Sequence, residues 1–88
     1  MDVDKVVSWI TQLLQHEGCV YQDDVVDFVV RAKAENLLRE NADGNLVLGR
    51  SILAAFKAET ESTVVWVKPD RYWRWRVLED ESGRDARG

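Results

Sequence analysis

Apolar residues recur at three- and four-residue intervals near the start of the chain, which predicts a helix over residues 3–17. Asp2 or Asp4 can cap its first turn, and Gly18 can end it. Trp9 lies about 100° from the middle of the apolar face, so we expect it at the margin of the core. The face consists of Val3, Val6, Val7, Ile10, Leu13 and Leu14.

A second helix is predicted over residues 23–38. Asp23 and Asp24 suit its N-terminus, where negative charge is stabilised, and the β-leaning residues 19–21 connect it to the first helix. Its apolar positions form two stripes, so we expect a central helix that is covered on two sides. The first stripe is Val25, Phe28, Val29 and Ala32, and the second is Val26, Val30 and Leu37.

The sequence NADGN, residues 41–45, is the strongest turn signal in the first half of the chain, because Asp-Gly tolerates positive φ. Residues 46–48 are predicted to be extended. Helical spacing then resumes and predicts a third helix over residues 50–60.

The stretch VVWVKPDRYWRWR, residues 64–76, alternates around one Pro-Asp pair. A two-residue loop at Pro69 and Asp70 predicts an antiparallel hairpin whose three tryptophans share one face. A one-residue bulge would instead move Trp66 to the other face. The predicted pairs are Lys68 with Arg71, Val67 with Tyr72, Trp66 with Trp73, and Val64 with Trp75. The opposite face would hold Val65, Val67, Tyr72, Arg74 and Arg76, a mixed surface suited to solvent or a ligand.

Helix, short strand, helix, turn, helix and hairpin is the order of a winged helix-turn-helix. We therefore expect an α+β fold, a small winged helix-turn-helix-like domain with three helices and a C-terminal two-stranded β-hairpin. The domain is expected to span residues 1–78. Residues 79–88, EDESGRDARG, contain no apolar residue larger than alanine and are expected to form a flexible acidic and polar tail.

Composition fits one small cytoplasmic domain. The chain has 88 residues, is 45% hydrophobic and contains four tryptophans, enough for a single aromatic-rich core. Its only cysteine, Cys19, excludes an internal disulfide and indicates a reducing compartment. The sequence shows no secretory leader and no apolar run of the ~18 residues that a membrane span needs.

Charge is unevenly distributed along the chain. The net charge of −4 argues against a general affinity for polyanions. Residues 63–77, however, carry four basic and one acidic side chain, so the positive excess is confined to the predicted hairpin. A basic hairpin is one of the two means by which winged helices contact DNA.

The nucleic-acid hypothesis assigns Lys68, Arg71, Arg74 and Arg76 to phosphates, with Tyr72 able to stack on a base. The alternative is that these cations project into water, cover the tryptophans with their stems and pair with nearby carboxylates.

The third helix would enter the major groove in a standard winged helix. Among its predicted outward positions only Arg50 and Lys57 are basic, and no Asn or Gln is present to bind adenine. Sequence-specific binding is therefore weakly supported. The remaining outward positions are Ser51, Ala54, Ala58 and Glu61.

A protein partner or a second copy of the chain is the other hypothesis, because an exposed apolar patch in such proteins marks an interface. The candidate interface residues are Trp9, Val26, Val30, Leu37 and Trp66. The alternative is that the second helix is simply enclosed by the first and third.

Catalytic and cofactor motifs are absent from the sequence, so we expect neither an enzyme nor a cofactor. His16, Cys19 and Asp23 have the spacing of metal ligands, but no second Cys or His completes a zinc site. Asp23, Asp24 and Asp27 are better explained as partners of a helix dipole than as an acid pair or magnesium site. No Gly-rich phosphate loop occurs, and the one histidine has no nucleophile motif around it.

The stretches GCVYQDDVVDFVV, GNLVL…ILAAF and TVVW…RYWR resemble an uncharacterised family of small bacterial proteins, known as a domain of unknown function, over about residues 3–76. The most specific portions are YQDDVVDFVV and the tryptophan-rich segment. The resemblance implies no activity, ligand or catalytic residue. Small open reading frames of this kind also occur in mobile elements such as integron cassettes and phages.

Taken together, the sequence predicts a non-enzymatic module that binds a macromolecule. The fold and the basic hairpin favour weak DNA binding, while the acidic remainder and the third helix favour a protein partner or a homodimer without nucleic-acid binding.

Overall fold

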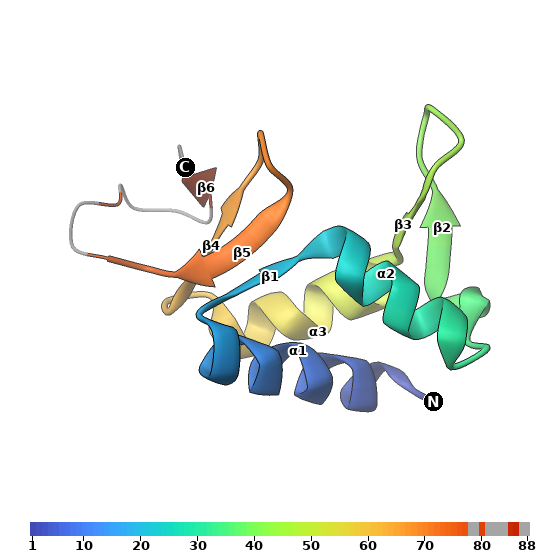
Figure 1. Ribbon diagram of the computed structural model, residues 1–88, viewed down its shortest axis with the longest axis horizontal. Helices are drawn as coiled ribbons and strands as arrows, with labels where there is room; N and C mark the ends of the chain where they lie inside the picture. Colours follow the sequence, from blue (N-terminus) through green and yellow to red (C-terminus); the bar gives the residue numbers. More distant parts are fainter. Residues whose placement is uncertain (78–79, 81–84, 87–88) are drawn as a thin grey trace.

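The computed structural model describes residues 1–77, 80, 85 and 86. Within them, three α-helices pack beside two small sheets in an α+β fold (Figure 1). The helices are α1 (Val3–Glu17), α2 (Gln22–Arg31) and α3 (Arg50–Thr60). The predictions for the first and third helices are confirmed.

Helix α1 begins and ends at the predicted caps. The Asp2 side chain accepts a hydrogen bond from the Lys5 backbone N–H at 2.9 Å. Gly18 adopts a left-handed φ of 84°, and its N–H donates to the Leu14 carbonyl at 2.8 Å. Trp9 is half-buried at the edge of the α1 core face, as its helical position predicts.

Helix α2 ends at Arg31, so the predicted helix over 23–38 is wrong in its last seven positions. Lys33 adopts a left-handed φ of 57°, and its N–H donates to the Val30 carbonyl at 2.9 Å. The Ala34 N–H donates to the Val29 carbonyl at 3.1 Å. These two bonds form a Schellman motif, which usually has glycine at the left-handed position. A lysine there gives the sequence no stop signal.

The chain after α2 forms a short hairpin instead of more helix. A 3₁₀ turn, Glu35–Leu37, leads into β2 (Leu38–Glu40), which pairs antiparallel with β3 (Leu46–Leu48). The predicted turn NADGN joins them, and the Asn41 side-chain oxygen accepts the backbone N–H groups of residues 43 and 45 at 2.9 and 3.0 Å. Leu37, expected on the second helix, therefore lies outside it.

The larger sheet has the strand order β1-β5-β4-β6. Its strands are β1 (Cys19–Tyr21), β4 (Val64–Val67), β5 (Tyr72–Trp75) and β6 (Asp85–Ala86). Strand β5 is antiparallel to both β1 and β4, and β6 runs parallel to β4. The predicted pairs of Val64 with Trp75, Trp66 with Trp73 and Val67 with Tyr72 are present, with no bulge between β4 and β5. Lys68 and Arg71 lie in the turn, and β1 and β6 extend the predicted two-stranded hairpin into a four-stranded sheet.

The tryptophan face of this sheet closes the core. Trp73 is nearly buried, and its ring meets the Phe56 ring of α3 edge-on at a centroid distance of 5.3 Å. The Trp66 ring lies against that of Trp73 at 4.8 Å. Trp75 is more exposed, but its indole N–H donates to the Leu14 carbonyl at 3.2 Å, which ties the hairpin to the end of α1.

The opposite face is less open than predicted. Val65 and Val67 have no exposed surface, so the expectation of a solvent- or ligand-facing surface is wrong for them. Residues after β5 contact the sheet again. Asp80 pairs with Arg74 of β5, and β6 lies along β4. Asp80, Asp85 and Ala86 are the described residues of the expected tail, and the others lie outside the described residues.

Two hairpins project to the same side of the molecule, one beyond each end of α3 (Figure 1). The core beneath them joins α1, α2, α3 and the tryptophan face of the sheet. Its largest fully buried side chains are Phe56, Ile10, Leu14, Leu48 and Ile52. The longest helix in the described part of the chain, α1, has 15 residues, and no helix there has both the length and the apolarity needed to cross a membrane.

Candidate binding surfaces

The tip of the β4–β5 hairpin presents two exposed cations, Lys68 and Arg71. The Arg71 N–H donates to the Lys68 carbonyl at 3.3 Å, and Arg71 takes a left-handed φ of 54° after Pro69 and Asp70. The Arg71 carbonyl accepts the Gln22 N–H at 2.9 Å, so the tip is held against the start of α2. Within the described residues neither cation forms an ion pair.

An aromatic pair lies beside this tip. The rings of Tyr21 and Tyr72 are 5.0 Å apart and tilted by 37°, because β1 pairs with β5 and places the two residues opposite each other. Tyr21 is exposed and Tyr72 is half-buried. The sequence predicted Tyr72 as a stacking residue, whereas Tyr21 was missed because no local signal indicates which strand pairs with β5.

Arg74 is engaged within the protein. Its guanidinium forms two hydrogen bonds to the Asp80 carboxylate, at 2.8 and 3.0 Å. These bonds from Arg74, together with the Val77 backbone N–H, lower the pKa of Asp80 to about 2. The bonds to Asp80 also raise the pKa of Arg74. The Arg74 charge is therefore largely neutralised before any phosphate approaches.

The other predicted nucleic-acid residues lie on two elements. Arg50 and Lys57 are exposed on α3, as are all the other predicted outward positions of that helix. Arg76 is half-buried, and its backbone N–H donates to the Thr63 carbonyl at 2.8 Å. Of the predicted hairpin cations, Lys68 and Arg71 are thus the two that are exposed.

The predicted interface residues come from several elements of the fold. Val26 and Val30 are half-buried on α2, and Leu37 lies beyond its end. Trp66 lies against Trp73 in the sheet, and Trp9 lies against α2. The stripe that would have joined Val26, Val30 and Leu37 is interrupted because the chain reverses at Lys33.

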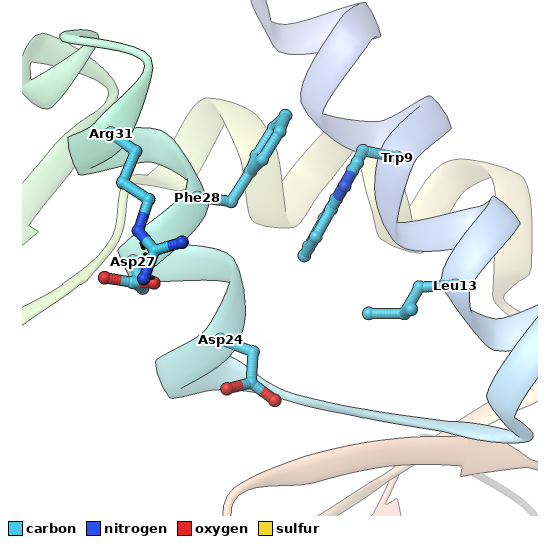
Figure 2. A pocket seen from close by; sticks show the side chains of 6 residues that line it. All are labelled: Trp9, Leu13, Asp24, Asp27, Phe28 and Arg31. Carbon is cyan, nitrogen blue, oxygen red and sulfur yellow. Dashed lines mark ion pairs between the residues drawn. The ribbon is translucent and has the colours of Figure 1, made fainter.

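A cavity of about 270 Å³ opens between α1 and α2 (Figure 2). Its apolar lining is Trp9, Phe28 and Leu13, and the Trp9 and Phe28 rings are stacked at 4.2 Å with only 6° between their planes. Its polar lining is Asp24, Asp27 and Arg31. We call these six residues the α1–α2 cleft. Of these six, only Trp9 could be predicted from the sequence as an interface residue, because the cleft depends on how the two helices meet.

Metal-binding geometry does not occur in the described part of the chain. No group of three His, Cys, Asp or Glu side chains there lies close enough together to hold an ion. Asp23 and Asp24 occupy the first turn of α2, where they complement its positive end.

A family model described as "Family of unknown function (DUF6953)" matches residues 2–75. The chain belongs to this family. The match runs from α1 to β5 and includes both the hairpin tip and the α1–α2 cleft. Asp80, which neutralises Arg74, lies beyond the matched residues. Searches of curated proteins and of solved structures gave no match.

Proposed function

We propose that this protein is a non-enzymatic binding module of the winged-helix type, and that its hairpin tip and α3 contact nucleic-acid phosphates weakly. The order of α1, β1, α2, α3 and the β4–β5 hairpin supports the winged-helix assignment, as does the pairing of β1 with β5. The β2–β3 hairpin is an addition to that plan, because it lies between the second and third helices.

The observation that carries the proposal is the exposed pair Lys68 and Arg71 at the hairpin tip, beside the Tyr21 and Tyr72 rings. Cations beside an aromatic surface are the combination that binds a phosphate backbone and stacks on a base. Arg50 and Lys57 add two exposed cations on α3.

The proposed binding is weak and depends strongly on salt. Four cations release few counterions, at about 0.9 per phosphate contact, and the net charge of −4 repels DNA at longer range. The exposed side of α3 consists mainly of small or acidic side chains, so we expect little discrimination between sequences.

Fluorescence anisotropy of a labelled duplex tests this proposal over about 20 to 200 mM salt. We expect Lys68→Ala/Arg71→Ala to reduce the slope of log affinity against log salt by about two. The matched control Lys5→Ala/Arg31→Ala removes two exposed cations from α1 and α2 and should leave the slope unchanged. Absence of binding at the lowest salt would overturn the proposal, as would equal losses in the two variants.

A protein partner is the second candidate function, and the α1–α2 cleft favours it. Paired aromatic rings at the surface between two helices supply the rigid apolar contact area on which protein recognition depends. Sedimentation of the purified chain tests the homodimer in particular, because a self-associating cleft would give a mass that rises with concentration and falls for Trp9→Ala.

A further inference from the structure

We propose that the α1–α2 cleft binds a cationic side chain, an arginine or lysine, from a basic segment of a partner protein. This inference concerns a surface separate from the hairpin tip, and it does not depend on nucleic-acid binding. Its support comes from the floor, the rim and the size of the cleft.

The floor of the cleft is aromatic and rigid. The Trp9 and Phe28 rings are stacked, half-buried and packed against the core, so little conformational entropy is lost when a ligand contacts them. Leu13 lies one turn after Trp9 on α1 and lines the same cleft (Figure 2). The methylene stem of a lysine or arginine can cover such a surface, and its charged head is attracted to aromatic rings.

The rim of the cleft is acidic. The rim carries two carboxylates, Asp24 and Asp27, and one cation, Arg31. Arg31 Nε lies 3.0 Å from Asp27 Oδ2, in an exposed ion pair between residues one helical turn apart. Exposed pairs of this kind are weak, so a ligand can compete for Asp27 at little cost. Asp24 has no ion-pair partner in the described part of the chain, although the N-terminus of α2 takes up part of its charge.

The size of the cleft is compatible with one long side chain. A volume of about 270 Å³ is just below the range of about 300–1,000 Å³ in which proteins hold drug-sized ligands. One long side chain is a better match than a cofactor or a folded helix. The excess of carboxylates in the cleft disfavours phosphate, and the chain's net charge of −4 adds attraction for a basic partner.

Proton–nitrogen NMR of the labelled protein tests the proposal, with acetyl-Ala-Arg-Ala-amide as the probe and its citrulline and norleucine analogues as controls. The indole signal of Trp9, assigned with Trp9→Phe, should shift and saturate with the arginine peptide. Citrulline keeps the shape of arginine but not its charge, and should bind roughly tenfold more weakly. Acetyl-Ala-Lys-Ala-amide distinguishes an ammonium from a guanidinium head, and saturation by either supports the proposal.

A pair of variants locates the site. Asp24→Asn should weaken binding of the arginine peptide severalfold. Asp23 lies in the same turn of α2 but does not line the cleft, so Asp23→Asn removes an equal charge and should leave the affinity unchanged. Equal effects of the two variants would overturn the proposal, because they would indicate diffuse attraction. Equal binding of the norleucine peptide would overturn it in favour of an apolar ligand. A shift of the Trp9 signal by duplex DNA, without a response to the peptides, would assign the cleft to nucleic acid.

Discussion

The two hairpins have the same antiparallel geometry but differ sharply in burial. In β4 three of four residues are fully buried, and Trp73 of β5 is only 4% exposed. In the β2–β3 hairpin only Leu48 is fully buried, and Leu46 is 44% exposed. An isolated two-stranded hairpin is marginally stable in water. The comparison shows that a hairpin contributes to this fold through its neighbours, which for β4 and β5 are β1, β6 and the helices.

The largest expected effect on stability comes from removing the ring of Trp73, at the centre of the buried hairpin. Trp73→Ala leaves a cavity beside Phe56 and Trp66, and should lower the free energy of unfolding by about 3–5 kcal/mol. Truncation to alanine in the exposed hairpin, Leu46→Ala, should change the free energy of unfolding by less than about 0.5 kcal/mol. Urea unfolding followed by circular dichroism measures both, and similar losses would contradict the comparison.

The next effect concerns the point where the exposed hairpin meets α3. A Cβ on Gly49 would lie 2.5 Å from the Leu37 carbonyl oxygen, so Gly49→Ala must displace backbone and should cost about 1–3 kcal/mol. Gly44→Ala in the turn of the same hairpin meets no atom within 4 Å and carries only the strain of its φ of 81°, roughly 1 kcal/mol. If thermal melts show Gly44→Ala to be the more damaging change, the close contact between position 49 and the Leu37 carbonyl does not limit stability.

A smaller effect has the opposite sign. Lys33→Gly places the residue that a left-handed helix end favours at a φ of 57°, and should raise the free energy of unfolding by roughly 0.5–1 kcal/mol. Lys33→Ala removes the same charge without relieving the backbone, and should not stabilise. Equal melting temperatures for the two variants would show that this conformation costs nothing.

The last prediction concerns the titration of Asp80, which should have the smallest effect on stability at neutral pH. The pKa of Asp80 is lowered to about 2, so the Arg74–Asp80 pair contributes stability that is present above the ordinary aspartate pKa of about 3.8 and is lost as pH falls through about 2. Carbon NMR of the carboxyl group should give that midpoint, and Arg74→Ala should raise it. Asp43→Asn, in the exposed turn, should leave it unchanged. A wild-type midpoint near 3.8 would mean that the pair does not form in solution.

Local patterns predicted those parts of the fold that local forces determine. The caps of α1, the bounds of α3 and the register of the β4–β5 hairpin follow from periodicity and from turn residues such as Gly18 and Pro69. The end of α2 could not be predicted, because Lys33 adopts a conformation that its residue type disfavours.

The candidate surfaces depend on tertiary packing that the sequence does not specify locally. Lys68 and Arg71 could be predicted as exposed because they belong to the hairpin turn. Tyr21 comes into place only through the pairing of β1 with β5, and the neutralisation of Arg74 only through the return of the chain at Asp80. The α1–α2 cleft likewise requires the angle at which two helices meet.

The pairing of β1 with β5 also sets an order of events during synthesis. Val20 leaves the ribosome long before its partner Trp73, so β1 must wait with an unpaired edge while α2, the β2–β3 hairpin and α3 are made. Contacts that are so distant in sequence close slowly, and unpaired strand edges attract other chains. The nascent protein is therefore most exposed to misassociation just before its tryptophan-rich hairpin emerges.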